Sequence, residues 1–191
     1  MLLVLDVETQ KSLSQVKEKD PRQLKASFTG VLVKDKSKEQ YLGFWENELD
    51  KLWPILERAD LVVGFNLIAF DYPVLSFYYP GQLAKLPTLD ILQQFKEQAG
   101  HRISLDNIAQ PTLGMAKTGS GLKAIELYRQ GKLAELKKYC LKDVEITYQI
   151  YRHGQKFGFL NYRDKWNNIR KVKVNFSRPV KQTEVQMTLG G

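Results

Sequence analysis

The stretch LLVLDVET, residues 2–9, places four consecutive aliphatic side chains ahead of two carboxylates. An unbroken apolar run of this length is typical of a strand buried on both faces of a sheet. Side chains two positions apart on a strand point to the same face, so Asp6 and Glu8 should project together where the strand ends. Two neighbouring carboxylates repel each other unless a cation lies between them. The alternative is that the strand simply ends at the surface and leaves its acids in solvent.

The rest of the chain alternates between predicted strands and predicted helices. The apolar patterns predict strands at residues 1–7, 28–33, 40–45, 61–65 and 171–176. Helical spacing predicts helices at residues 46–58, 71–79, 90–98, 104–113, 122–130 and 132–152, the last closed by His153 and Gly154. This order indicates an α/β fold with a mixed central β-sheet flanked by helices. We expect one domain over residues 1–160 and a basic C-terminal extension over residues 161–191.

The composition is that of an ordinary globular protein, because 43% of the 191 residues are hydrophobic and 26% are charged. The single cysteine, Cys140, cannot form an internal disulfide, which points to a reducing, cytoplasmic setting. The longest apolar runs fall far short of the roughly 20 residues that cross a bilayer. No basic segment precedes the first apolar run, as it would in a signal peptide. We therefore expect a cytoplasmic protein with no membrane span.

The net charge of +8 is unevenly distributed along the chain. From residue 162 to the end, seven basic side chains stand against two acidic ones. A basic end is typical of a protein that binds a polyanion such as nucleic acid. A solvated, solubilising surface explains the same charges equally well, so charge alone leaves both interpretations open.

A second acidic motif is GFNLIAFDYPVL, residues 64–75. Asp71 comes just ahead of a predicted helix with Pro73 in its first turn, so one interpretation is an N-terminal cap. A cap does not explain why the apolar Phe70 and Leu75 stand so close to this carboxylate. The capping and functional interpretations are compatible, and Asp71 stays a candidate for both roles.

The third motif is YCLKD, residues 139–143, inside the long last helix. Residues four apart share a helix face, so Tyr139 and Asp143 project together. Leu136 and Ile146 lie along the same stripe, which should therefore face the core. An aspartate on such a stripe costs several kcal/mol unless it is paired or bound to a metal. Asp143 is for this reason the most informative acidic position in the chain.

Read in order, the three motifs resemble those of the DEDD superfamily of 3′–5′ exonucleases, in its tyrosine-bearing (DEDDy) branch. The second and third motifs are similar to those of the proofreading exonuclease domain of family-B DNA polymerases. As a stand-alone domain, the chain resembles the bacterial YprB-type ribonuclease H-like proteins. The resemblance spans about residues 1–154 and implies a ribonuclease H-like fold. Two departures are that no polymerase module is present and that the basic tail lies outside the motifs.

The resemblance implies a metal-dependent 3′–5′ exonuclease acting on single-stranded nucleic acid, with DNA favoured over RNA. Such an enzyme hydrolyses phosphodiester bonds by a two-metal-ion mechanism and releases nucleoside 5′-monophosphates. Two divalent ions, Mg²⁺ or Mn²⁺, suit a set of carboxylate oxygens. The metal ligands implied are Asp6, Glu8, Asp71 and Asp143. Tyr139 would complete the catalytic set by orienting the attacking water, because a free tyrosine with a pKa near 10 is a poor base at neutral pH.

By the same resemblance, Thr9, Asn66 and Phe70 would contact the terminal nucleotide. Two other functions remain open from the sequence. One is an endonuclease of the same fold, and the other is a catalytically weak, nuclease-like module that binds nucleic acid. The presence of all four acids and the tyrosine counts against the second of these.

Three further features carry weaker signals. Asp90 precedes a predicted helix, and capping that helix is its expected role. His101 lacks the His-x4-Asp spacing of a rival general base, so we expect a surface or substrate-contacting residue. The stretch KTGSG, residues 117–121, has neither the residue order nor the preceding strand of a phosphate-binding loop.

Overall fold

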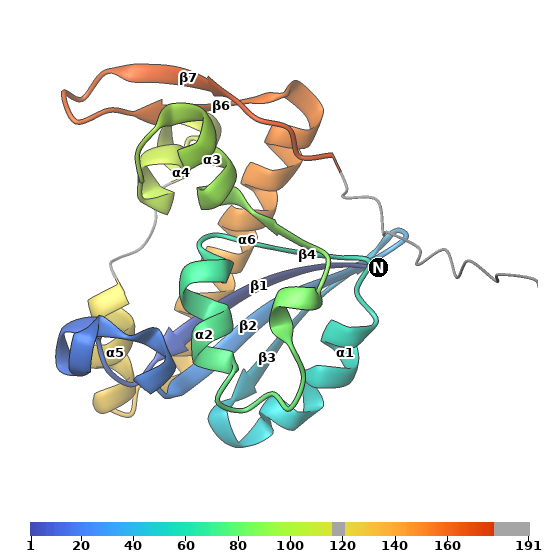
Figure 1. The fold of residues 1–191 in the computed structure, drawn as a ribbon, viewed down its shortest axis with the longest axis vertical. Helices are drawn as coiled ribbons and strands as arrows, with labels where there is room; N and C mark the ends of the chain where they lie inside the picture. The colour runs from blue at the N-terminus through green and yellow to red at the C-terminus, as the bar shows by residue number, and fades with distance from the viewer. Residues whose placement is uncertain (116–120, 178–191) are drawn as a thin grey trace, which may run out of the picture.

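The computed structural model describes residues 1–115 and 121–177 and is built around a mixed five-stranded sheet (Figure 1). Its strand order is β3-β2-β1-β4-β5. The first three strands pair antiparallel, whereas β4 runs parallel to β1 and β5 runs parallel to β4. The strands are β1 (Leu2–Thr9), β2 (Ala26–Asp35), β3 (Lys38–Trp45), β4 (Leu61–Gly64) and β5 (Thr88–Asp90). The predicted mixed α/β class is confirmed. The weak signal at 117–120 and the end of the basic tail, 178–191, lie outside the described residues.

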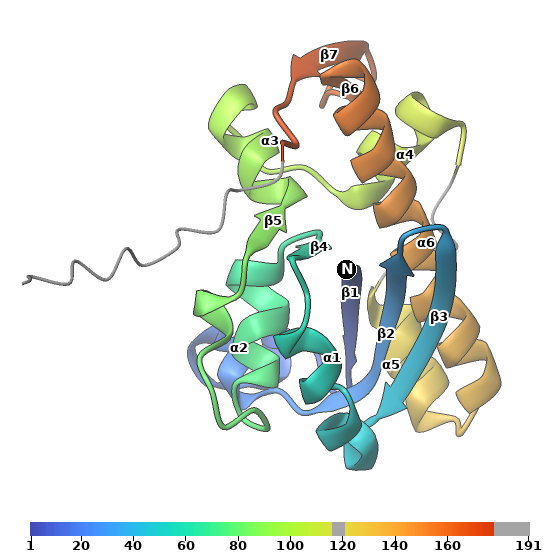
Figure 2. The same cartoon turned by 90° about the vertical axis from the view of Figure 1, so that its right-hand side faces the viewer.

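Helices cover both faces of this sheet, as Figure 2 shows with α1 and α2 on one side and α5 and α6 on the other. The α-helices are α1 (Trp53–Glu57), α2 (Tyr72–Leu75), α3 (Ile91–Ala99), α4 (Leu105–Leu113), α5 (Gly121–Arg129) and α6 (Leu133–Phe157). Alternate residues of β1 point to opposite faces of the sheet. Leu2 and Val4 pack in one buried cluster, and Leu3 and Leu5 pack in the other. The period of two therefore places Asp6 and Glu8 on the face that Leu2 and Val4 share. Among the described residues, no helix is both long and apolar enough to cross a membrane.

Helix α6 lies very close to the sheet because β2 has a glycine where the two meet. Gly30 pairs with Asp6 of β1, and a Cβ added to Gly30 would lie 2.9 Å from Cys140 Sγ and 3.2 Å from Val144 Cγ2. Any larger residue would push α6 away from the strands, since separations below 3.0 Å force atoms to move. This glycine sets the distance between the first and third acidic motifs.

Four secondary-structure predictions differ from the structure. The expected helix at 46–58 is a 3-10 helix, Glu46–Lys51, followed by α1, because Pro54 suits the first turn of a new helix. The expected helix at 71–79 is a π-helical turn, Leu67–Asp71, followed by the short α2. Strand β5 was missed, since three residues carry too little periodicity to identify a strand.

The fourth difference is the end of the last helix. Helix α6 continues to Phe157 and ends at Gly158, whose φ of 71° is the left-handed conformation of a C-cap. Gly154 lies inside the helix, where an added Cβ would come within 2.3 Å of the Phe176 ring. This glycine is therefore needed for close packing, and its small size misled the prediction.

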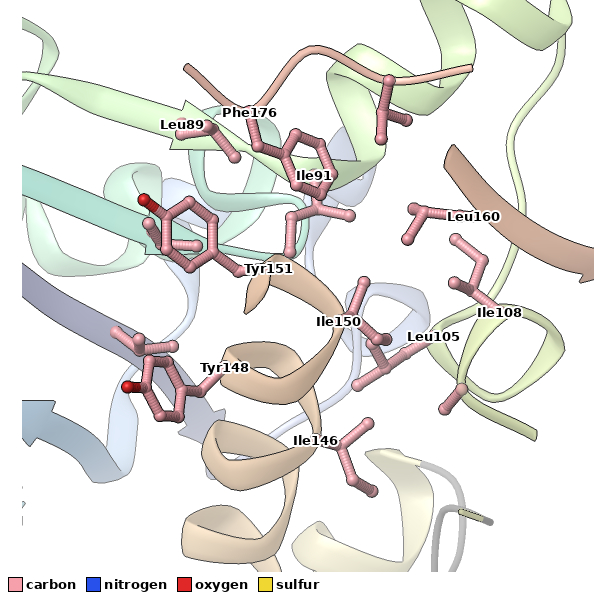
Figure 3. Close-up of a cluster of buried hydrophobic side chains, with 14 of the residues drawn as sticks. Leu89, Ile91, Leu105, Ile108, Ile146, Tyr148, Ile150, Tyr151, Leu160 and Phe176 are labelled. Atoms are coloured by element: carbon pink, nitrogen blue, oxygen red, sulfur yellow. The ribbon is translucent and has the colours of Figure 1, made fainter. Parts of the chain in front are cut away.

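After α6 the chain forms an antiparallel hairpin of β6 (Phe159–Arg163) and β7 (Ile169–Lys173). The strand expected at 171–176 is thus present in part. Thr112 of α4 bonds the backbone of Asn161 twice, donating to its carbonyl at 2.6 Å and accepting from its N–H at 3.0 Å. Figure 3 shows Leu160 and Phe176 in one buried cluster with Tyr151 and Ile150 of α6. Residues 161–177 therefore share a core with the rest of the described chain.

Candidate active site

The first motif ends β1 on the side that faces α6. Glu8 is buried, with 7% of its surface exposed, and Asp6 is half-buried. The pairing of β1 with β2 shifts register between Glu8 and Thr9, and Thr9, the last residue of the strand, pairs with Ala26. The Thr9 hydroxyl donates to the carbonyl of Lys11 at 2.7 Å, which fixes the first turn of the departing chain.

The second motif reaches the first through a single long-range hydrogen bond. Asp71 is 3% exposed, and its Oδ1 accepts the backbone N–H of Val7 at 2.9 Å, across 64 positions of sequence. Burial raises the pKa of the Asp71 carboxyl well above its usual range, and the nearby charge of Asp6 raises that pKa further. Asp71 makes no capping bond to α2, so the N-cap interpretation is wrong. Its carboxylate is held instead between the two acids of β1.

The third motif meets β1 through Cys140. The Cys140 thiol lies 3.4 Å from Asp6 Oδ2 and 3.6 Å from the Asp6 carbonyl oxygen. Burial raises the pKa of Cys140, and the charges of Asp6, Glu8 and Asp143 raise it further. Asp143 is 1% exposed and lies on the buried side of α6. The α6 segment that carries Asp143 therefore touches the end of β1 through Cys140.

A cleft of about 360 Å³ opens at this end of β1. Five of the residues singled out from the sequence line it: Asp6, Glu8, Thr9, Phe70 and Asp71. Residues of α5 and the loop after β1 form the opposite wall. The cleft is thus a concave, acidic site with an aromatic side chain beside the carboxylates, of a size that admits a nucleotide unit.

Three of the singled-out residues do not line this cleft. Asp143 is buried on α6, and Tyr139 and Asn66 line other hollows. Tyr139 is buried among Phe28, Ala124 and Leu127, and it lines a larger groove of about 1010 Å³ along α5, α6 and the edge of β3. The side chain of Asn66 lines a third hollow, where its Oδ1 accepts a 2.8 Å hydrogen bond from Arg102 Nη2. The cleft of the acids therefore includes none of these three side chains.

Asp90 has a larger role than the sequence predicts. It caps α3 as expected, accepting from the N–H groups of Leu92 and Gln93. It also accepts the N–H groups of Asn66 at 2.9 Å and Ile68 at 3.1 Å. Asn66 has a φ of 75°, a left-handed conformation that asparagine tolerates better than most residues. Asp90 thereby fixes the turn that carries Asp71 into the cleft, a long-range function with no local signal.

The residues of the cleft suit a hard divalent cation. Ligand atoms of Asp6, Glu8 and Cys140 all lie within 4.8 Å of one another. The Cys140 thiol, with its raised pKa, stays protonated, so the carboxylate oxygens are the available donors. Oxygen donors of this kind suit Mg²⁺ or Mn²⁺. A bound cation would lower the raised pKa of Asp71, because it stabilises the ionised carboxylate.

Comparisons with known proteins agree with this architecture. A model of the RNase H superfamily matches residues 4–155. No curated protein sequence matches the chain. Among solved structures, 24 chains match. One is the family B DNA polymerase from the hyperthermophilic archaeon Pyrobaculum calidifontis, with 19% identity and a TM-score of 0.61 over 82% of this chain and 24% of that chain. The chain thus spans about a quarter of that polymerase, and at this identity the likeness concerns the fold.

Proposed function

The chain belongs to the RNase H superfamily, and from this premise we propose that it is a metal-dependent 3′–5′ exonuclease of single-stranded nucleic acid. The proposed reaction is hydrolysis of the terminal phosphodiester bond with release of a nucleoside 5′-monophosphate, with DNA favoured as the substrate. The assignment to the tyrosine-bearing DEDD branch rests on the order and spacing of the three acidic motifs.

One observation carries the proposal: segments of all three acidic motifs meet at the end of β1. Asp71 is bonded to the backbone between Asp6 and Glu8, and Asp143 comes from the α6 segment whose Cys140 touches Asp6. Carboxylates gathered from separate segments suit a divalent cation, which prefers oxygen donors.

Asp6, Glu8, Asp71 and Asp143 would hold two divalent ions, Mg²⁺ or Mn²⁺. When bound, the ions supply Lewis-acid stabilisation of the developing charge and lower the pKa of bound water. The protein's own contribution is rigidity. Asp71 is oriented by the Val7 N–H, and the close approach at Gly30 fixes α6 against β1. Carboxylates held in this way need little reorganisation during the reaction.

Tyr139 would orient the attacking water by a hydrogen bond. It lies one helical turn before Asp143 on α6 and is held by packing against α5. Thr9 and Phe70 line the acidic cleft, which supports contact with the terminal nucleotide. Asn66 would act from the neighbouring hollow, where Arg102 holds its amide.

The test uses single-stranded DNA and RNA oligonucleotides labelled at either end, in Mg²⁺ and in Mn²⁺. We expect stepwise shortening from the 3′ end in the wild type, with no cleavage by Asp6→Asn or Asp143→Asn. Asp50→Asn is the matched control, because Asp50 is an exposed aspartate that does not line the cleft. Full activity in Asp143→Asn would refute the proposal, and cleavage of a circular single strand would identify an endonuclease instead.

A further inference from the structure

The turn between β6 and β7 presents an aromatic ring among cations. Trp166 is 66% exposed, and the Lys165 ammonium lies 4.3 Å from the centre of its ring. Ile169, the first residue of β7, is exposed as well. Single exposed apolar side chains are common on protein surfaces, so the combination with cations is the informative part.

This turn is rigid in its own right. Asp164 accepts the backbone N–H groups of Trp166 and Asn168, each at 2.9 Å, and the Arg170 side chain at 2.6 Å. Arg163 bridges across the turn to Asn167 and reaches Gln110 of α4 at 2.8 Å. The ring of Trp166 is therefore presented by an ordered backbone, which lowers the entropy cost of binding.

A groove of about 750 Å³ lies beside the turn, between the hairpin and the loop before α4. Four cationic side chains line it: Arg102, Arg163, Lys165 and Arg170. Its one carboxylate, Asp164, is already engaged by Arg170. Lysine and arginine bind backbone phosphates, and exposed aromatic rings stack on unpaired bases. The chemistry of this groove is complementary to single-stranded nucleic acid.

The groove shares Arg102 with the hollow beside it. This hollow, of about 440 Å³, is also lined by Ile68 and Asn66. The segment that carries Asn66 and Ile68 also supplies Phe65 and Phe70 to the acidic cleft. Figure 1 shows the hairpin at the top of the view and the end of β1 at the lower left, so the two lie apart along the long axis of the molecule. The hairpin groove and the middle hollow thus share Arg102, and the middle hollow and the cleft are lined by neighbouring residues of the segment 65–71.

We propose that the hairpin turn is a second contact site for the single-stranded substrate, remote from the end being cleaved. The strand would leave the cleft past Ile68 and Arg102, and a base several nucleotides from the end would stack on Trp166. Lys165 binds a neighbouring phosphate. This inference rests on the proposed function, and it adds a preference for long over short strands.

The first test measures binding of fluorescein-labelled dT12 and dT3 to the full chain in EDTA, where no cleavage occurs. Trp166→Ala should raise the Kd for dT12 about tenfold, the loss expected for one base stacked on an aromatic ring. The Kd for dT3, which is too short to reach the hairpin from the cleft, should change less than twofold. Phe77→Ala is the matched control, because Phe77 is also 66% exposed and lines none of the three hollows.

A second test isolates the phosphate contact. In a salt titration of dT12 binding, Lys165→Ala should reduce the slope of log Kd against log salt by about 0.7, the value for one phosphate on a single strand. Lys38→Ala, an exposed lysine at the start of β3, should leave the slope unchanged. Circular dichroism of each variant checks that the fold is retained.

The outcomes separate the two proposals. Equal Kd values for wild type and Trp166→Ala with dT12 would overturn the hairpin site even if the enzyme is active. A second contrary result is that heparin displaces dT12 while Trp166→Ala leaves the Kd for dT12 unchanged. The hairpin would then be a nonspecific polyanion-binding surface, and the proposal would be overturned. Length-dependent binding by a chain that cleaves nothing would refute the exonuclease and leave the hairpin site standing.

Discussion

Two aspartates in this molecule have opposite electrostatic environments. Asp164, in the hairpin turn, accepts hydrogen bonds from Arg170 and two backbone N–H groups, which lower its pKa to about 2. Asp71, in the cleft, is buried beside another acid, and both effects raise its pKa. The hairpin carboxylate is stabilised as a charge by the fold itself. The environment of the cleft carboxylate instead favours its protonated form. This difference distinguishes an acid with a structural role from an acid suited to bind a cation.

The largest expected effect is on catalysis. Asp71→Asn should lower the rate of oligonucleotide cleavage by at least about a hundredfold, because a metal ligand contributes several kcal/mol of transition-state stabilisation. Asp164→Asn should keep most of the activity on a short oligonucleotide. Initial rates at saturating Mn²⁺ measure both. Similar losses in the two variants would remove the distinction between the two aspartates.

The next effect is on metal binding and its dependence on pH. Mn²⁺ should raise the melting temperature of the wild type, because the ion binds the folded state alone. Metal ligands must be ionised, and the raised pKa of Asp71 lets protons compete with the ion. The increase should therefore be several degrees at pH 8 and much smaller at pH 5. Thermal melts with and without Mn²⁺ at the two pH values provide the measurement, and an increase that is larger at pH 5 would contradict the assignment.

The contrast between the two aspartates also marks what the sequence can reveal. The opening strand, predicted at residues 1–7 and found at Leu2–Thr9, the long helix and the three acidic motifs follow from local periodicity and spacing. The structure places Asp6, Glu8 and Asp71 in one cleft. The bond from Val7 to Asp71 and the double role of Asp90 join segments far apart in sequence, which no local pattern encodes. Gly154 illustrates the same limit, because a glycine is needed there to make room for the ring of Phe176, which is distant in sequence.

A smaller effect concerns the stability of the metal-free protein. Because the folded-state pKa of Asp71 is raised, the folded chain holds this proton more tightly than the unfolded chain, whose value is near 3.8. Stability is therefore lost as the pH rises from that value through the folded-state pKa. Asparagine keeps an acceptor for the Val7 N–H and carries no charge. In EDTA at pH 8, Asp71→Asn should melt at the same temperature as the wild type or above it. A clear decrease would show that the carboxylate stabilises the fold.

The smallest effect concerns the stability contributed by Asp164, which depends on pH in the opposite sense to that of Asp71. The pKa of Asp164 is lowered from 3.8 to about 2, so its contribution to stability is present above the unfolded value and is lost as the pH falls toward 2. Asp164→Asn removes the charge that holds Arg170 and keeps an acceptor for the turn. Its melting temperature should be slightly below that of the wild type at pH 7, and the gap should close as the pH approaches 2. Melts across this range test the sign, because a gap that widens on acidification would mean that the hairpin charge destabilises the fold, as the cleft charge does.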